Sequence, residues 1–251
     1  MATSSEPNVL DDIRVLEVGA ELGAWCGKLL ADMGAAVVKI EPREGDPTRS
    51  YEPFYQDEPG IDRSLYFWHY NTNKSSVTLD LTTDAGRSLF ERLAADADVI
   101  VDSMPPGRMR ELGLDYDSIV SVAPTVVMAS ITPFGQEGPF ADWASTDLTA
   151  LAFGGPVWNC GYDDHSLPPV RGGGNQAQHV VSHYTANAIM IALIHRQFTG
   201  AGQHIDANMH AALNVTTEGA TYNWLVARDT VQRQTGRHAA VVPTSPSQVL
   251  C

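Results

Sequence analysis

IRVLEVGAELGAWCGKLLADMGAAVVKI, residues 13–40, decides the fold of this chain. Residues 13–18 and 36–40 are dominated by Val, Ile and Leu, as buried strands are. Between them, residues 24–33 carry the apolar spacing of a helix. A strand, a helix and a second strand in this order form a βαβ unit, whose two strands are parallel.

The same alternation continues outward from this unit. Strands are expected at 76–80, 99–101 and 124–130, with an amphipathic helix over 83–96. A long helix is expected over 176–198, with enough apolar residues to be buried on most sides. The chain is therefore predicted to be an α/β protein with a Rossmann-like parallel sheet flanked by helices, which binds ligands at the carboxyl ends of its strands.

Composition and charge exclude several classes of protein. The chain has 251 residues, 43% of them hydrophobic, which is ample for a buried core. The net charge of −14 disfavours binding to nucleic acid or to an anionic membrane. Cys26, Cys160 and Cys251 are too widely spaced for a disulfide framework or a C-x-x-C zinc site, and residues 1–12 do not resemble a signal peptide. We expect a cytoplasmic protein.

The first strand-to-helix turn, residues 19–27, is rich in glycine and allows two interpretations. Glu41 follows 22 residues after Gly19, where a ribose-binding acid of a nicotinamide-dependent oxidoreductase would lie. The glycine spacing does not match G-x-G-x-x-G, however. The alternative is that these glycines only permit a tight turn and close packing of the helix.

Four blocks of sequence resemble one known family. They are C-G-K-L-L-A-D-M-G-A-A-V-V-K-I-E-P (26–42), N-K-S-S-V-T-L-D-L (73–81), P-G-R-M-R-E-L-G-L (106–114) and S-I-T-P-F-G-Q-E-G-P (130–139). The chain is identified by them as a member of the family III CoA-transferases, the CaiB/BaiF or formyl-CoA transferase-like superfamily. The blocks keep the family's order across nearly the whole chain.

The resemblance implies a domain organisation. Residues 13–225 would form the CoA-binding large domain, after a disordered N-terminus over 1–12. Residues 226–251 would begin the linker and small domain, so that the sequence corresponds to an N-terminal portion with the small domain truncated. The family forms interlocked dimers, and some relatives pair a subunit that has the catalytic aspartate with one that lacks it. The resemblance thus implies a homo-oligomer or a hetero-oligomer with a paralogous CoA-transferase subunit.

The resemblance also implies where CoA would bind as a substrate rather than as a permanently bound cofactor. The residues placed there are Ala20, Arg43, Asn73, Lys74, Met104 and Arg110. Each of the cations could equally be a solvated surface charge. Ser75 and Glu111 stand where the family has arginines, which predicts reduced affinity for CoA.

The catalytic position is the main departure from the family. Its aspartate opens the long helix that ends in T-G-x-G-Q and attacks the acyl-CoA thioester. Counting back from Thr199, this position is Gln178, whose amide is a poor nucleophile. His179 could act as a base or nucleophile instead, or could be a hydrogen-bonded packing residue. His179 and His183 have the spacing of a metal pair, but no third ligand is apparent and no metal site is predicted.

Three functions follow from these patterns. The first is a CoA-transferase that moves CoA between an acyl-CoA and a carboxylic acid, with Gln178 at the position of the aspartate. The second is a non-catalytic CoA-binding subunit of a hetero-oligomeric CoA-transferase. The third is a nicotinamide-dependent oxidoreductase. The family's racemase branch is disfavoured, because Thr146 takes the place of its histidine.

Overall fold

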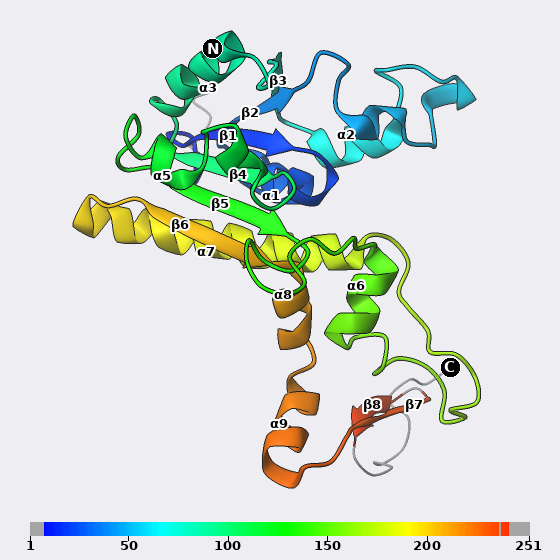
Figure 1. Cartoon of the computed structure of the whole chain (residues 1–251). Helices are drawn as coiled ribbons and strands as arrows, with labels where there is room; N and C mark the ends of the chain where they lie inside the picture. The colour runs from blue at the N-terminus through cyan, green and yellow to red at the C-terminus, as the bar shows by residue number, and fades with distance from the viewer. Residues whose placement is uncertain (1–7, 236, 241–251) are drawn as a thin grey trace, which may run out of the picture.

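A single parallel sheet of six strands organises the molecule (Figure 1). The computed structural model describes residues 8–235 and 237–240. The strands are β1 (Arg14–Gly19), β2 (Ala36–Glu41), β3 (Ser75–Thr78), β4 (Val99–Ser103), β5 (Val127–Thr132) and β6 (Gln203–Asn208). Their spatial order is β3-β2-β1-β4-β5-β6, the doubly wound order in which the direction of strand succession reverses between β1 and β4.

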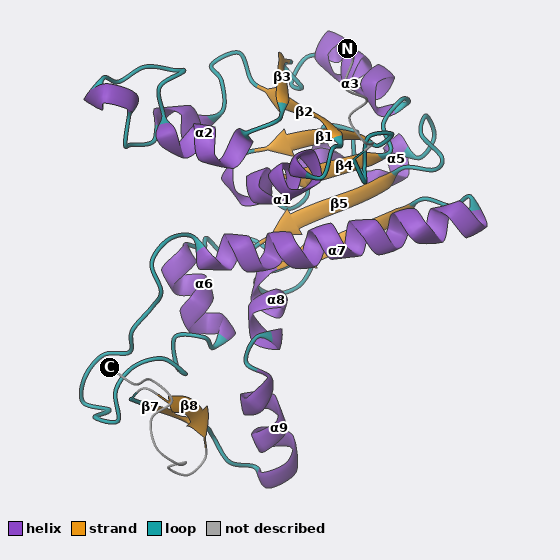
Figure 2. Cartoon of the chain, turned by 180° about the vertical axis from the view of Figure 1, so that it is seen from behind, coloured by secondary structure: helices purple, strands orange, loops and turns teal. Residues whose placement is uncertain are grey.

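Helices cover both faces of this sheet (Figures 1 and 2). They are α1 (Glu21–Asp32), α2 (Leu65–Asn71), α3 (Asp84–Ala94), α4 (Arg108–Glu111), α5 (Tyr116–Ile119), α6 (Asp147–Gly154), α7 (Gln176–Thr199), α8 (Met209–Val215) and α9 (Glu218–Ala227), with 3-10 turns at Pro47–Ser50 and Tyr55–Asp57. None of the helices in the described ranges is both long enough and apolar enough to cross a membrane.

Two hydrophobic clusters lie on opposite sides of the sheet because neighbouring strand residues point to opposite faces. Val15 of β1 packs with Leu30 of α1 and Ile189 of α7 in one cluster. Leu16, the next residue of β1, belongs to the other cluster, together with the fully buried Phe90 of α3. The sheet therefore separates an α1/α7 layer from an α3/α4/α5 layer.

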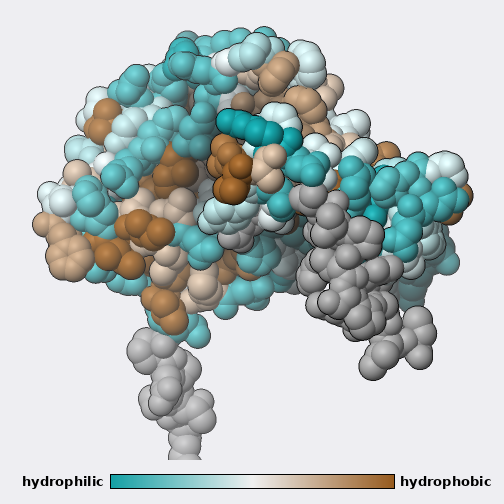
Figure 3. Space-filling model, turned by 90° about the horizontal axis from the view of Figure 1, so that it is seen from below, coloured by the Kyte–Doolittle hydropathy of each residue, from teal (hydrophilic) through white to brown (hydrophobic). Residues whose placement is uncertain are grey.

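The C-terminal part of the described chain extends away from the sheet. α8 and α9 project from the α7 side, and an antiparallel hairpin of β7 (Gln232–Gln234) and β8 (Arg237–Ala240) follows them (Figure 1). Trp158 anchors the segment, since its indole N–H donates to the backbone oxygen of Val231 at 2.8 Å. Seen from below, apolar side chains reach the surface at several places (Figure 3).

The predicted Rossmann-like parallel sheet is confirmed, with three differences. β6 was not predicted. The expectation that the long helix would be buried on most sides is wrong: α7 is covered where it faces the sheet, α1, α6 and α8, whereas Ile191 is 67% and Phe198 84% exposed. The ordered chain also begins before residue 13, because Leu10 is buried and its N–H donates to the oxygen of Met33. Residues 1–7, 236 and 241–251, on which part of the domain prediction falls, lie outside the described residues.

Candidate active site

The candidate site lies where the strand order reverses. β1 ends at Gly19 and β4 at Ser103, and the two residues are register partners in the sheet. Gly19 has a φ of 99°, and a Cβ atom there would lie 2.5 Å from the Ser103 hydroxyl oxygen. Glycine is therefore required at this turn, since a side chain would clash and be strained. The tight turn brings the first residues of α1 directly to the edge of the sheet, at the position where doubly wound folds bind ligands.

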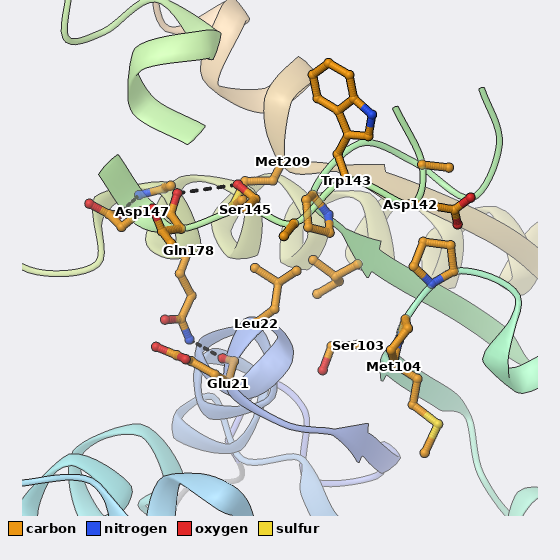
Figure 4. Close-up of a pocket in the computed structure, with 18 of the residues that line it drawn as sticks. Glu21, Leu22, Ser103, Met104, Asp142, Trp143, Ser145, Asp147, Gln178 and Met209 are labelled. Carbon is orange, nitrogen blue, oxygen red and sulfur yellow. Dashed lines mark hydrogen bonds between the residues drawn. The ribbon is translucent and has the colours of Figure 1, made fainter. Parts of the chain in front are cut away.

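Two cavities open on either side of this point. The larger has a volume of about 610 Å³ and lies between the first turns of α1 and α7, the 103–106 loop and the 141–147 segment (Figure 4). The smaller, about 310 Å³, lies over the ends of β1, β2 and β4. Ser103, Met104 and Pro105 line both cavities. An elongated ligand could therefore occupy both across this shared wall.

Gln178 forms part of the wall of the larger cavity. Its side chain comes from the first turn of α7 and is only 5% exposed. The amide nitrogen donates to the backbone oxygen of Glu21, which ties α7 to the first turn of α1 (Figure 4). The amide oxygen is buried without a hydrogen-bond partner among the described residues. A buried acceptor without a partner is costly, so the hydrogen bond of the amide nitrogen is the polar contact that holds this side chain in place.

Glu21 brings a carboxylate to the same wall (Figure 4). The Tyr66 hydroxyl donates to its Oε1 at 2.6 Å, and the Asn175 amide approaches the same oxygen at 3.5 Å. In the described part of the chain, the donor that approaches Oε2 is the Tyr51 hydroxyl, at 3.5 Å. Burial and the Glu21 charge raise the pKa of Tyr66, so its phenol stays protonated as the donor. No side chain caps the N-terminus of α1, whose dipole favours a carboxylate in this first turn.

The two other carboxylates of this cavity have different surroundings. Asp147 opens α6, and its two oxygens are taken by the backbone N–H of Ala177 at 2.8 Å and by an ion pair with Arg171. It thereby holds the start of α7 against α6. Asp142 lies on an exposed loop (Figure 4).

His179 points away from the larger cavity although it follows Gln178 directly. Its Nε2 lies 3.0 Å from the Tyr70 hydroxyl, and its ring packs against Trp25 with a centroid distance of 4.5 Å. Burial lowers the pKa of His179, and His69 and His183 lower it further, so the imidazole is held neutral. The structure does not bring His179 to the cavity with Gln178. No group of His, Cys, Asp or Glu in the described part of the chain is arranged to hold a metal ion.

The six residues expected at a CoA site do not lie together in the structure. Ala20 and Met104 line the smaller cavity. Arg43 is exposed, and Arg110 pairs with Asp115 at 3.4 Å beside a separate cavity of about 240 Å³. The structure brings only the first two to the ends of β1 and β4.

Asn73 and Lys74 are engaged by other residues of the fold, Asn73 at the surface and Lys74 in the interior. The Asn73 amide donates to Asp32 at 2.7 Å. The Lys74 ammonium is almost fully buried, pairs with Glu17 at 2.7 Å and donates to the backbone oxygen of Ala24. Both side chains therefore hold α1 to its neighbours and do not reach either cavity.

Two residues at the site were not predicted from the sequence. Arg108 lines the smaller cavity and pairs with Glu111 at 2.8 Å while 40% of its side chain is exposed. Glu21 lines the larger cavity. Their positions in the sequence could have identified them. Glu21 is an acid in the first turn after β1, and Arg108 follows the end of β4 within the P-G block.

Known proteins with similar sequences point to one family. The sequence model of CoA-transferase family III matches residues 10–248. The chain is 36% identical over 233 residues to the succinyl-CoA:(R)-benzylsuccinate CoA-transferase subunit BbsE of Thauera aromatica, covering 93% of this chain and 56% of that protein. It is 35% identical to the succinate–glutarate CoA-transferase of Agrobacterium fabrum, covering 93% and 59%. The chain thus spans between half and three-fifths of these relatives.

A solved structure agrees with this result. A CAIB/BAIF family protein from Brucella suis superposes with a TM-score of 0.84 at 34% identity, over 91% of this chain and 60% of that one.

Proposed function

Because the chain belongs to CoA-transferase family III, we propose that it binds an acyl-CoA where its strand order reverses and takes part in moving CoA between an acyl-CoA and a carboxylic acid. The observation that carries this proposal is the pair of adjoining cavities with the shared wall Ser103–Pro105. A long molecule with a charged end and a reactive end fits such a pair. CoA enters as a substrate and not as a resident cofactor.

The chemistry of the two cavities favours one orientation. The smaller cavity has Arg108 at its edge and the turn Gly19–Ala20 at its floor, which suits the phosphate-bearing end of CoA. In a chain of net charge −14, such a local cation is needed to hold an anion. The pantetheine arm would cross Met104. The thioester would then lie in the larger cavity, beside Gln178 and Glu21.

A non-catalytic CoA-binding subunit is the second candidate. It is favoured by the buried amide of Gln178 at the position of the family's aspartate, and one similar protein is itself named as a subunit. In this case a paralogous CoA-transferase subunit would supply the nucleophile, and the chain alone would bind CoA without reacting.

The oxidoreductase alternative is disfavoured because Glu41 is buried and hydrogen-bonded within the fold. This acid is 3% exposed and accepts from Arg49 at 2.7 and 2.8 Å, one bond to each oxygen, and from the N–H of Asp46. Burial raises the pKa of Glu41, but the hydrogen bonds from Arg49, Ser76 and Asp46 and the charge of Arg49 together outweigh burial and hold the value at about 2. Its oxygens are therefore occupied and are not free to bind a ribose.

Calorimetric titration tests the proposal. CoA and acetyl-CoA are titrated into the intact chain and into Arg108→Ala, with Arg92→Ala on the exposed side of α3 as the matched control. Loss of the Arg108 contact with phosphate should weaken binding about tenfold, the scale of a charge-assisted hydrogen bond. Arg92→Ala should bind as the wild type does. Failure of the wild type to bind either compound would contradict the proposal.

A further inference from the structure

We propose that Glu21 is the catalytic carboxylate of this chain and that it replaces the aspartate missing at Gln178. This inference rests on the proposed function, because it assumes that an acyl-CoA thioester lies in the larger cavity. It differs from the expectation for Gln178 and His179 by placing the nucleophile on α1 instead of α7.

Elimination among the cavity's carboxylates leads to Glu21. Asp147 has both oxygens engaged, by Ala177 and Arg171, and removing it would loosen the start of α7. Asp142 is on an exposed loop, where water surrounds it. Glu21 is half-buried on a helix that packs against the sheet, so its position is set by the fold.

The contacts of Glu21 orient one oxygen and leave the other available. Tyr66 holds Oε1 at 2.6 Å, and Asn175 donates both to Tyr66 and toward the same oxygen. Within residues 8–235 and 237–240, Oε2 has only the long 3.5 Å approach of the Tyr51 hydroxyl. A carboxylate fixed through one oxygen presents the other as a nucleophile without having to reorient.

Gln178 has a complementary role in this arrangement. Its amide nitrogen is bonded to the backbone oxygen of Glu21, which fixes the first turn of α1 relative to α7. Gln178 is therefore a positioning residue, and an amide is better suited to that role than a second carboxylate, which would repel Glu21.

The reaction balances with Glu21 as the only protein nucleophile. Oε2 of Glu21 attacks the thioester carbonyl, and the C–S bond breaks to give a mixed glutamyl anhydride and CoA thiolate. The thiolate attacks the glutamyl carbonyl, which releases the first carboxylic acid and leaves a glutamyl-CoA thioester. The acceptor carboxylate attacks this thioester and expels CoA thiolate, which then attacks the acceptor's carbonyl in the new anhydride. This last step gives the new acyl-CoA and restores Glu21.

Chemical trapping tests the assignment. The intact chain is incubated with acetyl-CoA, treated with hydroxylamine and digested for peptide mass spectrometry. Hydroxylamine converts a glutamyl anhydride or thioester to a hydroxamate. The hydroxamate is expected on Glu21. It should be lost in Glu21→Gln, which keeps the size of the side chain and the acceptor for Tyr66, and retained in Glu44→Gln, an exposed control.

Calorimetry of the same variants separates this inference from the proposed function. Binding of CoA by Glu21→Gln with loss of the hydroxamate supports both. Binding of CoA by the wild type without a hydroxamate at Glu21, or with one at another residue, overturns the assignment of Glu21 and leaves the CoA-binding proposal intact. Absence of binding and of hydroxamate overturns both.

Discussion

Replacing Lys39 with methionine should destabilise the chain by about 3–5 kcal/mol, the cost of removing one partner of a buried ion pair. Lys39 lies in β2 with its side chain 1% exposed, and its ammonium contacts Glu17 at 2.8 Å and Asp46 at 2.7 Å. Both carboxylates are themselves almost fully buried. After the substitution, Asp46 would keep its charge in the interior with no cation opposite it, and Glu17 would keep only Lys74.

The pH range of this effect follows from the pKa of Lys39. Burial lowers the value, but the charges of Glu17 and Asp46 outweigh burial and raise the pKa above its ordinary value. A lysine whose folded pKa is raised contributes its full stabilisation below the unfolded value of about 10.4 and loses it as the pH rises through the folded value. The whole effect of Lys39→Met should therefore be present at neutral pH.

Urea unfolding followed by circular dichroism measures the loss. For a chain of this size, 3–5 kcal/mol should lower the midpoint by about 1–2 M urea. Lys28→Met is the matched control, because Lys28 pairs with Asp32 at 2.7 Å on a partly exposed helix surface. Exposed pairs contribute less than about 1 kcal/mol. If Lys39→Met cost no more than Lys28→Met, the buried charges would not be structurally important and the reasoning would be wrong.

Three other substitutions test the packing and the buried charges around the sheet. Burial raises the pKa of Asp102 to about 6, so its stabilising contribution is complete below about pH 4 and lost as the pH rises through 6. Asp102→Asn should therefore stabilise the chain at pH 8 by about 2–3 kcal/mol, seen as a higher Tm, and this gain should vanish near pH 4. Gly27→Ala should cost about 1–3 kcal/mol in urea unfolding, because its Cβ would lie 1.8 Å from the Glu17 carboxylate. Phe90→Ala should lower stability by about 3–5 kcal/mol, since the ring is fully buried; a loss below 1 kcal/mol would contradict this packing.

The sequence pattern predicts β1, β2, β4 and β5 because strands buried on both faces are aliphatic. β6 escaped detection for the opposite reason. Its sequence, Q-H-I-D-A-N, is polar and half of its side chains are exposed, since it is an edge strand held by backbone hydrogen bonds to β5. α7 carries apolar residues on all of its sides, but only part of its surface is covered. Composition alone could not distinguish such a helix from a fully buried one.

The candidate site was only partly readable from the sequence. Ala20 and Met104, which the resemblance implies at a CoA site, line the smaller cavity because they follow the strand ends directly. Lys74 could be identified as a cation, but its pairing with Glu17 depends on a contact between residues 57 positions apart, which no local pattern reveals. The same holds for the contact between Gln178 and Glu21, which joins residues far apart in the chain.

The residues that carry the family resemblance and those that line the larger cavity are largely different sets. Lys39 and Lys74, in two of the recognisable blocks, neutralise the buried Glu17 and so stabilise the sheet. Substitution of such residues would disrupt the fold, whereas Glu21 and Gln178 line the larger cavity, and a fold does not determine the chemistry of its site. Since the Gln178 amide bonds to the backbone of Glu21, a carboxylate at either position borders the same cavity. An exchange of acid and amide between these two positions would keep a carboxylate at the wall of the larger cavity, so a glutamine at position 178 is compatible with a carboxylate nucleophile in the proposed site.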